Sequence, residues 1–184
     1  NIFKKEFGIH SFVGNKKNLD AKKALVGDAT CNIAGFVSGY TGDGAKTVLP
    51  GEALVKIDFR LIPKMDPKKQ VIRLKKHLKS HGFHDVKIKI FHGEAAARTD
   101  SSHPFVSQVK NAADEAFGKS ILNVSNAGTG PMYPFVDILK SPCISIGSTY
   151  MFSRIHSPNE FARVDLLKKT TKCICLIMEN FGKN

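Results

Sequence analysis

The sequence lacks several patterns that would assign a protein to a class at once. It has no Trp, and its 4 Cys among 184 residues show no CxxC spacing, which argues against a zinc cluster or a disulfide framework. We therefore expect free thiols, most of them buried, in a reducing cytoplasm. No apolar run approaches the roughly 20 residues that span a bilayer, and no signal-peptide pattern opens the chain. The first residue is not Met, which favours a chain that begins within a longer polypeptide.

Complete metal-binding and nucleotide-binding motifs are also missing. The sequence contains no HxH, HExxH, HxD or adjacent Glu-Glu pair, and its glycine-rich segment 127–131 fits neither GxxxxGK[ST] nor GxGxxG. His77 and His81 have the i, i+4 spacing of a metal clamp. Their Lys-rich surroundings oppose a bound cation, so we expect them to be solvated.

Charge is plentiful but uneven. The net charge is +12, and residues 1–93 carry 18 Lys and Arg against 8 Asp and Glu, which leaves +10. Residues 94–184 carry 10 against 8, which leaves +2. A basic half can bind nucleic acid or another polyanion, and it can equally be an ordinary solvated surface. The change near residue 93 predicts a boundary there.

The first half predicts a small layer of strands and a helix. Residues 53–61 alternate apolar and charged side chains, as in a strand with one buried face. Asp66-Pro67 gives an N-cap followed by proline at the first helical position, and Gly82 gives a C-terminal stop. Three further elements are expected, namely a helix over 18–26 and strands over 31–40 and 86–90.

The second half has the pattern of a doubly wound α/β domain. A helix is expected over 104–117, with Val106, Val109, Ala113 and Ala116 inward. A short helix follows up to residue 139, and the apolar segment 142–146 is typical of a strand buried in a parallel sheet. The last helix is expected to face inward through one stripe: Leu167, Thr171, Ile174, Ile177, Met178 and Phe181. Functional loops of such domains follow the carboxyl ends of the strands.

Two residues in these loops are candidates for chemistry. His156 follows the expected buried strand, and a neutral imidazole there suits zinc or another transition metal. A zinc site needs three or four ligands, so a structural, hydrogen-bonded histidine is the alternative. Gly128 begins a turn whose backbone N–H groups could hold a carboxylate or an oxyanion, or could simply close a turn.

Two residues of the first half are candidates for binding. Arg60 lies on the charged face of its strand, where a guanidinium can hold a carboxylate through two parallel bonds. It can equally be a surface charge beside Asp58. Thr47 could reach a ligand or close a turn.

Four segments together resemble a known family. GYTGDGAKTVLP (39–50) resembles its phrase GYxGxGxKTVIP, and KIDFRLIP (56–63) followed by Asp66-Pro67 resembles KxSFRLVPxxDP. AGTGPMYPF (127–135) and RIHSPNE (154–160) resemble two further phrases in the same order and spacing. The family is the aminoacylase, carnosinase and succinyl-diaminopimelate desuccinylase group of dizinc metallopeptidases. Within this family, the sequence pattern is most similar to the dipeptidase-like branch, which has a long lid.

The resemblance implies two domains and a set of roles. Residues 1–93 correspond to part of an α+β two-layer lid that also forms a homodimer. Residues 94–184 correspond to the end of a doubly wound, zinc-peptidase-like catalytic domain. His156 matches a metal-ligand histidine of a site for two divalent ions, zinc or else cobalt or manganese. The substrate-binding positions that match are Arg60, which binds the substrate carboxylate, Thr47, a nearby lid residue, and Gly128 and Thr129, which line the pocket.

The remaining parts of the family's site have no counterpart in residues 1–184. These are the HxD motif, the bridging Asp, the Glu-Glu pair with the general base, a further acidic ligand and a lid histidine. The resemblance therefore implies the C-terminal portion of an enzyme that cleaves an amide bond of a dipeptide or N-acyl amino acid, with no catalytic base of its own and no activity alone. The alternatives are a basic nucleic-acid-binding module and a purely dimerising module. No membrane partner is expected, and the absence of the aromatic strand phrase of RNA-recognition folds and of a helix-turn-helix pattern argues against nucleic acid as the partner.

Overall fold

The computed structural model describes residues 2–126, 128 and 130–183. The chain divides into two compact units. We call residues 22–96 the hairpin unit, and residues 1–21 with 97–184 the helical unit. The boundary at residue 21 falls within α2 (Asn18–Gly27), which forms where the sequence predicts a helix. Two short helices precede it, α1 (Ile2–Glu6) and η1 (Val13–Asn15).

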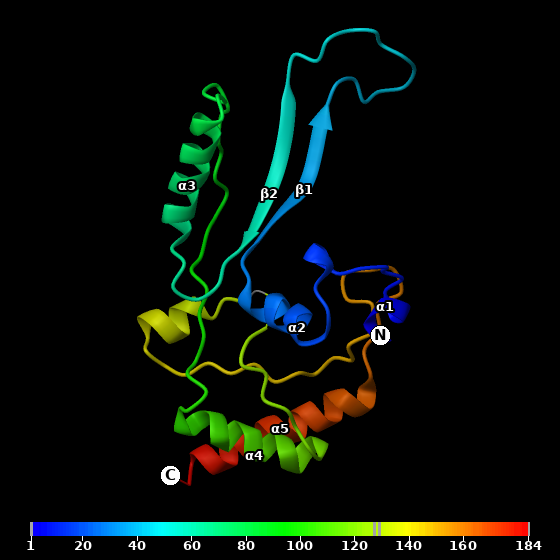
Figure 1. Cartoon of the computed structure of the whole chain (residues 1–184). Helices are drawn as coiled ribbons and strands as arrows, with labels where there is room; N and C mark the ends of the chain where they lie inside the picture. The colour runs from blue at the N-terminus through cyan, green and yellow to red at the C-terminus, as the bar shows by residue number, and fades with distance from the viewer. Residues whose placement is uncertain (1, 127, 129, 184) are drawn as a thin grey trace. The chain divides into compact units, whose positions relative to one another are not determined.

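An antiparallel pair of strands forms the centre of the hairpin unit (Figure 1). β1 (Thr30–Ser38) pairs with β2 (Ala53–Arg60), close to the predicted bounds. The register places Ser38 opposite Ala53 at the loop end and Thr30 opposite Arg60 at the other end, with an irregularity after Ile33. The long loop 39–52 joins the two strands at the loop end.

The apolar face of this hairpin is not buried as expected. One face carries Val55, Ile57 and Phe59 of β2, which remain 39–43% exposed, and Ile33 and Phe36 of β1, which remain 66–70% exposed. Within the described residues no layer covers these side chains. A two-stranded hairpin is marginal by itself, so this face needs a covering partner to contribute fully to stability.

α3 (Pro67–Ser80) follows the local signals in the sequence. The Asp66 carboxylate accepts hydrogen bonds from the backbone N–H groups of Lys68 and Lys69 at 2.8 and 3.4 Å, and Pro67 takes the first helical position. Gly82 ends the helix with a φ of +87°, which a residue without Cβ adopts at little cost. The predicted helix is confirmed together with both of its ends.

Two of the predicted strands are absent from the described part of the chain. Residues 86–90 and 142–146 run without the ladder of backbone hydrogen bonds that defines a strand. Cys143 instead bonds to the Thr99 hydroxyl, which accepts from the Cys143 N–H and donates to the Cys143 carbonyl, both at 2.8 Å. A parallel strand needs a neighbour on at least one edge, and none of the described residues provides one for either segment.

Two helices build the core of the helical unit. α4 (Pro104–Phe117) and α5 (Val164–Phe181) pack against each other (Figure 1). The buried side chains at this interface are Val106, Val109 and Ala112 of α4 and Cys173 of α5. Val106 and Val109 were predicted to face inward; Ala112 was not, whereas the predicted Ala113 and Ala116 are half-buried.

The face of α5 that packs inward is not the predicted one. Cys173 is fully buried, and its stripe continues through the half-buried Leu166, Thr170 and Ile177. Most of the predicted stripe is exposed, including Met178 at 70% and Phe181 at 69%. α5 thus has two adjacent apolar stripes. Periodicity finds both but cannot say which one α4 covers.

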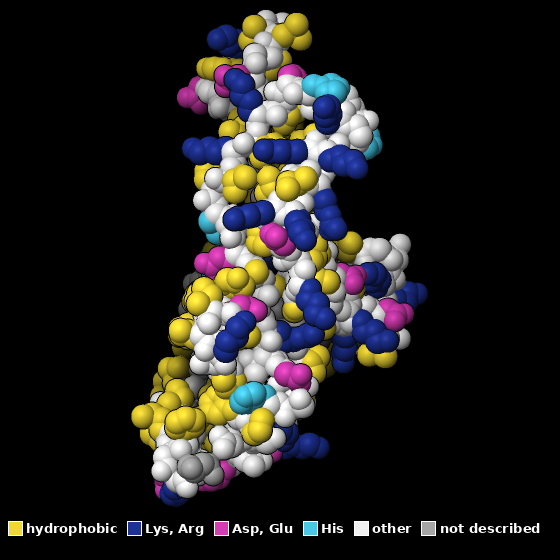
Figure 2. All heavy atoms as spheres, turned by 90° about the vertical axis from the view of Figure 1, so that its left-hand side faces the viewer, with side chains coloured by type: hydrophobic (Ala, Val, Ile, Leu, Met, Phe, Trp, Pro, Cys, Tyr) yellow, Lys and Arg dark blue, Asp and Glu magenta, His cyan; other side chains and the backbone are white. Residues whose placement is uncertain are grey.

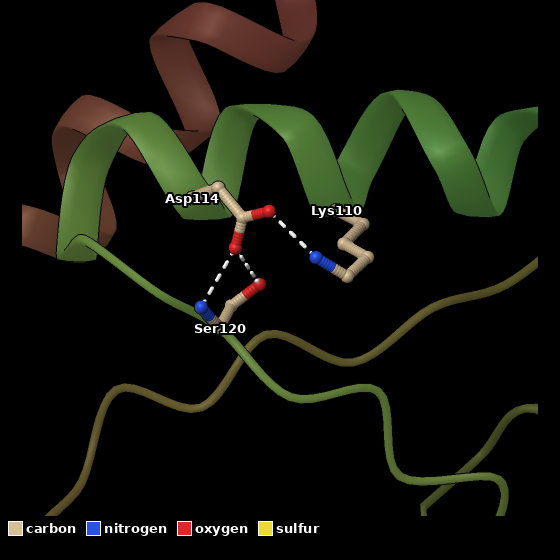
Figure 3. Close-up of polar contacts among 3 residues, drawn as sticks. All are labelled: Lys110, Asp114 and Ser120. Carbon is tan, nitrogen blue, oxygen red and sulfur yellow. Dashed lines mark hydrogen bonds and ion pairs between the residues drawn. The ribbon is translucent and has the colours of Figure 1, made fainter.

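A carboxylate joins the end of α4 to the chain beyond it (Figure 3). Asp114 accepts from Lys110 Nζ at 2.6 Å, and from both the backbone N–H and the hydroxyl of Ser120 at 2.7 and 2.5 Å. These hydrogen bonds hold the pKa of Asp114 far below its usual range. The turn that joins α4 to Ser120 passes through Gly118, which has a φ of +89°.

All four cysteines are free, as predicted, but most are not buried. Cys173 is buried and Cys143 is half-buried, whereas Cys31 and Cys175 are exposed. Burial raises the pKa of the Cys173 thiol. Between Ile2 and Lys183, the described helices include none long and apolar enough to cross a bilayer.

In the helical unit, η2 (Pro134–Ile138) accounts for the short helix expected before residue 139.

Candidate functional site

His156 projects from a tightly turned loop of the helical unit. Its side chain is exposed and its φ is +62°, and Arg154 and Asn159 also have positive φ. Non-glycine residues rarely adopt this conformation, so three within six residues mark a loop whose shape the surrounding contacts must hold. The His156 N–H donates to the Glu160 carboxylate at 3.4 Å, and the Ser157 N–H donates to the Arg154 carbonyl at 2.9 Å.

Aromatic side chains hold the base of this loop. Tyr150 and Phe152 lie with ring centroids 5.5 Å apart, and Phe152 contacts Phe7 at 5.7 Å. The Phe161 N–H donates to the Ser153 carbonyl at 3.1 Å and closes the loop, and Ser153 is 1% exposed. Sequence reasoning missed this support, although the clustered aromatic residues from 150 to 161 were a visible signal.

Arg163 also contacts Tyr150 and so helps to hold the base of the His156 loop. Its guanidinium lies 5.5 Å from the Tyr150 ring centroid and pairs with Asp165 at 2.6 Å. The pair raises the pKa of Arg163 and lowers the pKa of Asp165. The His156 loop therefore begins on a ring cluster and ends on an ion pair at the start of α5.

The glycine turn is only partly described. The Gly128 N–H donates to the Asn126 side-chain oxygen at 2.8 Å, so in this structure it is committed to a local turn. A Cβ at Gly128 would lie 3.3 Å from the same oxygen, which is a tight contact. Thr129, the other pocket residue predicted here, lies outside the described residues, as does Ala127.

Arg60 ends β2 in the hairpin unit and is paired with a carboxylate. Its Nε donates to Asp58 Oδ2 at 3.0 Å, and the two side chains are about half exposed. They are neighbours on one face of the strand because they are two residues apart. Asp58 stands where the family phrase has Ser, so a substrate carboxylate at Arg60 must compete with a carboxylate of the chain itself.

Thr47 lies in the loop 39–52, beyond the end of β2 that is opposite to Arg60. Thr47 is exposed in the loop beyond Ser38 and Ala53, whereas Arg60 is at the opposite end of β2. At about 3.3 Å per residue, the strand alone separates these ends by about 23 Å. The loop also holds a cavity of about 250 Å³, lined in part by Tyr40 and Lys46. The length of β2 therefore separates these two candidate binding residues within one hairpin.

The described residues do not form a metal site by themselves. No group of three or more His, Cys, Asp or Glu side chains lies close enough to share an ion in that part of the chain. His77 and His81 are exposed on α3, with ring centroids 4.3 Å apart. The His81 Nδ1 is 2.8 Å from the His77 carbonyl, so its ring makes a local helix-end contact. His156 offers one ligand where zinc requires at least three.

Comparison with known proteins assigns the class. Residues 3–180 match the family described as peptidase family M20/M25/M40, and the chain belongs to this family. The resemblance predicted from the four sequence phrases is thereby confirmed. A comparison with curated proteins gave no match.

Three solved structures show the relationship in detail. The M20 family metallo-carboxypeptidase Sso-CP2 from Sulfolobus solfataricus is 33% identical with a TM-score of 0.79, over 97% of this chain and 41% of its own. The dipeptidase Dug1p from Saccharomyces cerevisiae is 18% identical with a TM-score of 0.82, over 99% and 39%. Human carnosine dipeptidase 1 is 20% identical with a TM-score of 0.72, over 96% and 39%.

These matches fix the fold as part of an M20-like fold, mixed α/β with few strands. The chain spans about two fifths of the length of the structures it matches. The second and third structures, at 18% and 20% identity, bear on the fold alone.

Proposed function

We propose that the chain is the C-terminal portion of a metal-dependent peptidase or deacylase that hydrolyses an amide bond of a dipeptide or N-acyl amino acid. The observation that carries this proposal is the family match over residues 3–180, together with 33% identity to a metallo-carboxypeptidase across nearly the whole chain. In this proposal residues 1–93 contribute part of the lid and residues 94–184 the end of the catalytic domain. Free thiols are consistent with a reducing cytoplasm.

The chain's own residues would bind and orient substrate. Arg60 would hold the substrate carboxylate through its guanidinium after displacing Asp58, and Gly128 and Thr129 would line the pocket. Thr47, in the loop at the other end of the hairpin, would also contact substrate, as the resemblance implies. His156 would be one ligand of two divalent ions, zinc or else cobalt or manganese, in the complete protein. When bound, such ions supply an activated water for hydrolysis.

The chain alone should be inactive. One imidazole cannot hold an ion with the affinity that catalysis requires, and among the described residues no group of three or more possible ligands surrounds it. The resemblance also implies that the family's general base lies outside this chain. The test is dipeptide hydrolysis by the purified 184-residue chain with added Zn²⁺, Co²⁺ or Mn²⁺. We expect no turnover above the metal-only blank, and robust hydrolysis would refute the proposal.

The role of Arg60 can be tested in the complete polypeptide that contains this chain. Arg60→Gln should lower kcat/KM for a dipeptide by about 10- to 100-fold, because a charged hydrogen bond to the carboxylate is lost. The substrate with its C-terminal carboxylate amidated should be insensitive to the change. Arg73→Gln removes an exposed arginine of the same unit and serves as the matched control. Equal effects of both substitutions would contradict the assignment.

Dimerisation through the hairpin unit is the second part of the proposal. In the region that the structure describes, β1 and β2 each leave one edge unpaired, and their apolar face is exposed. Unpaired edges and exposed apolar faces are features that a second subunit can cover. Light scattering after size exclusion should give twice the chain mass, and Ile57→Lys on the apolar face should give the monomer. A monomer at all concentrations would refute dimerisation through the hairpin unit.

A further inference from the structure

The outward side of α3 is a dense array of cations. Its exposed charged side chains are all basic, namely Lys68, Lys69, Arg73, Lys75, Lys76 and Lys79. Among the described residues, no carboxylate lies within ion-pair distance of any of them. Figure 2, which turns α3 toward the viewer, shows Lys and Arg side chains gathered over this part of the surface.

These cations form two rows along the helix. At 100° per residue, Lys68, Lys75 and Lys79 fall within about 40° of one another, and Lys69, Arg73 and Lys76 form a second group about 100° further round. Ile72 lies between the rows and is 64% exposed. Val71, Leu74 and Leu78 lie on the opposite side and are half-buried, so α3 is held by one face and presents both rows outward.

The array works against the stability of α3. Lys69 with Arg73 and Lys75 with Lys79 are like charges at i, i+4, which repel each other on a helix surface. Lys68 and Lys69 also lie in the first turn, where the helix dipole favours anions. A polyanion bound along α3 would offset the repulsion between these like charges and the unfavourable interaction of Lys68 and Lys69 with the helix dipole.

We propose that α3 binds duplex DNA by lying in the major groove with one row of cations toward each strand. A helix in this groove has phosphates on both flanks, which matches two rows separated by about 100° with an uncharged strip between them. A flat anionic membrane would meet both rows from one side only, and the strip between them offers it a single exposed apolar side chain, Ile72, to insert. Single-stranded nucleic acid is bound by stacking on aromatic side chains. α3 has no Phe, Tyr or Trp, and its one imidazole, His77, already lies against the His81 ring.

The array predicts affinity without base specificity. Five of the six cations are lysines, which contact phosphates as point charges, and Arg73 already donates to Gln70 at 3.2 Å. Binding is therefore expected to depend steeply on salt. Six phosphate contacts correspond to a slope of about −5.4 in log K against log salt, or about 40-fold weaker binding when salt doubles. This inference does not depend on the peptidase proposal.

The test measures fluorescence anisotropy of a labelled 20-base-pair DNA with the whole protein over a range of KCl concentrations. Removing either row, with Lys68, Lys75 and Lys79 or with Lys69, Arg73 and Lys76 changed to Gln, should reduce the salt slope by about half. The control changes Lys168, Lys169 and Lys172 of α5 to Gln, which removes the same charge elsewhere. Helix content by circular dichroism should be equal in all variants.

Two further probes decide between partners. An RNA duplex of the same sequence should bind at least tenfold more weakly, because the A-form major groove is too narrow for a helix. Phosphatidylserine vesicles should co-sediment with the row variants as well as with the control. The proposal is overturned if the DNA shows no salt-dependent binding, or if the row variants and the control variant bind DNA alike. It is also overturned if the RNA duplex binds as well as the DNA duplex, or if vesicles bind through α3 while DNA does not.

Discussion

Truncating a buried valine of α4 tests the core of the helical unit. Val109 is 7% exposed against α5, so Val109→Ala removes two carbons from a packed site. At about 0.8 kcal/mol per buried methylene, the transfer term is about 1.6 kcal/mol, and an incompletely closed cavity raises the total to about 2 kcal/mol. The higher helix propensity of Ala offsets about half a kcal/mol of this loss.

The matched control is Val164→Ala, which makes the same substitution at a residue of α5 that is 64% exposed. Thermal unfolding followed by circular dichroism at 222 nm should show Val109→Ala melting several degrees below the parent and Val164→Ala within about a degree. The sequence has no Trp, so tryptophan fluorescence is not an option. Equal melting temperatures for the two variants would refute the α4–α5 core.

Two further outcomes follow from charge and burial. The depressed pKa of Asp114 means that its hydrogen bonds stabilise the fold above the ordinary carboxyl pKa of about 4 and lose that effect as pH falls below it. Asp114→Asn should therefore lower the melting temperature at pH 7 and make little difference at pH 2, and an equal loss at both pH values would contradict this. For the thiols, the exposed Cys175 should react with iodoacetamide at pH 8, whereas Cys173 should not, because it is buried and its pKa is raised. Mass spectrometry of the peptides identifies which cysteine has reacted. Equal labelling of both cysteines would contradict the burial of Cys173.

Local signals in the sequence were sufficient where the structure depends on neighbours in the chain. Asp66, Pro67 and Gly82 determine both ends of α3 through bonds that span a few residues, and the alternation of residues 53–61 is enough for β2. The family resemblance also came from short, contiguous phrases. Their order along the chain carried information that no single phrase contains.

The errors came from features that depend on distant partners. Residues 142–146 have the composition of a buried strand, but a strand exists only through its pairing, and Cys143 bonds to the Thr99 hydroxyl instead. The inward face of α5 depends on which of two apolar stripes α4 covers. The phrases that named Thr47 and Arg60 carry no information on their separation, which follows from the length of β2 between them.

The candidate site was predicted only as separate residues. His156 and its Glu160 contact were accessible from the phrase that contains them, whereas the aromatic support through Tyr150, Phe152 and Phe7 joins residues more than 140 positions apart. The sequence already placed Arg60 beside Asp58, and the structure adds the 3.0 Å ion pair through which Asp58 would compete with a substrate.

The most direct test of the peptidase assignment is the metal content of the complete polypeptide that contains this chain. Elemental analysis by mass spectrometry, with isothermal titration for affinity, should find two divalent ions per chain in the parent protein and in His84→Ala, an exposed histidine of the hairpin unit. His156→Ala should lose at least one ion or bind it at least tenfold more weakly. Unchanged stoichiometry and affinity in His156→Ala would contradict the account.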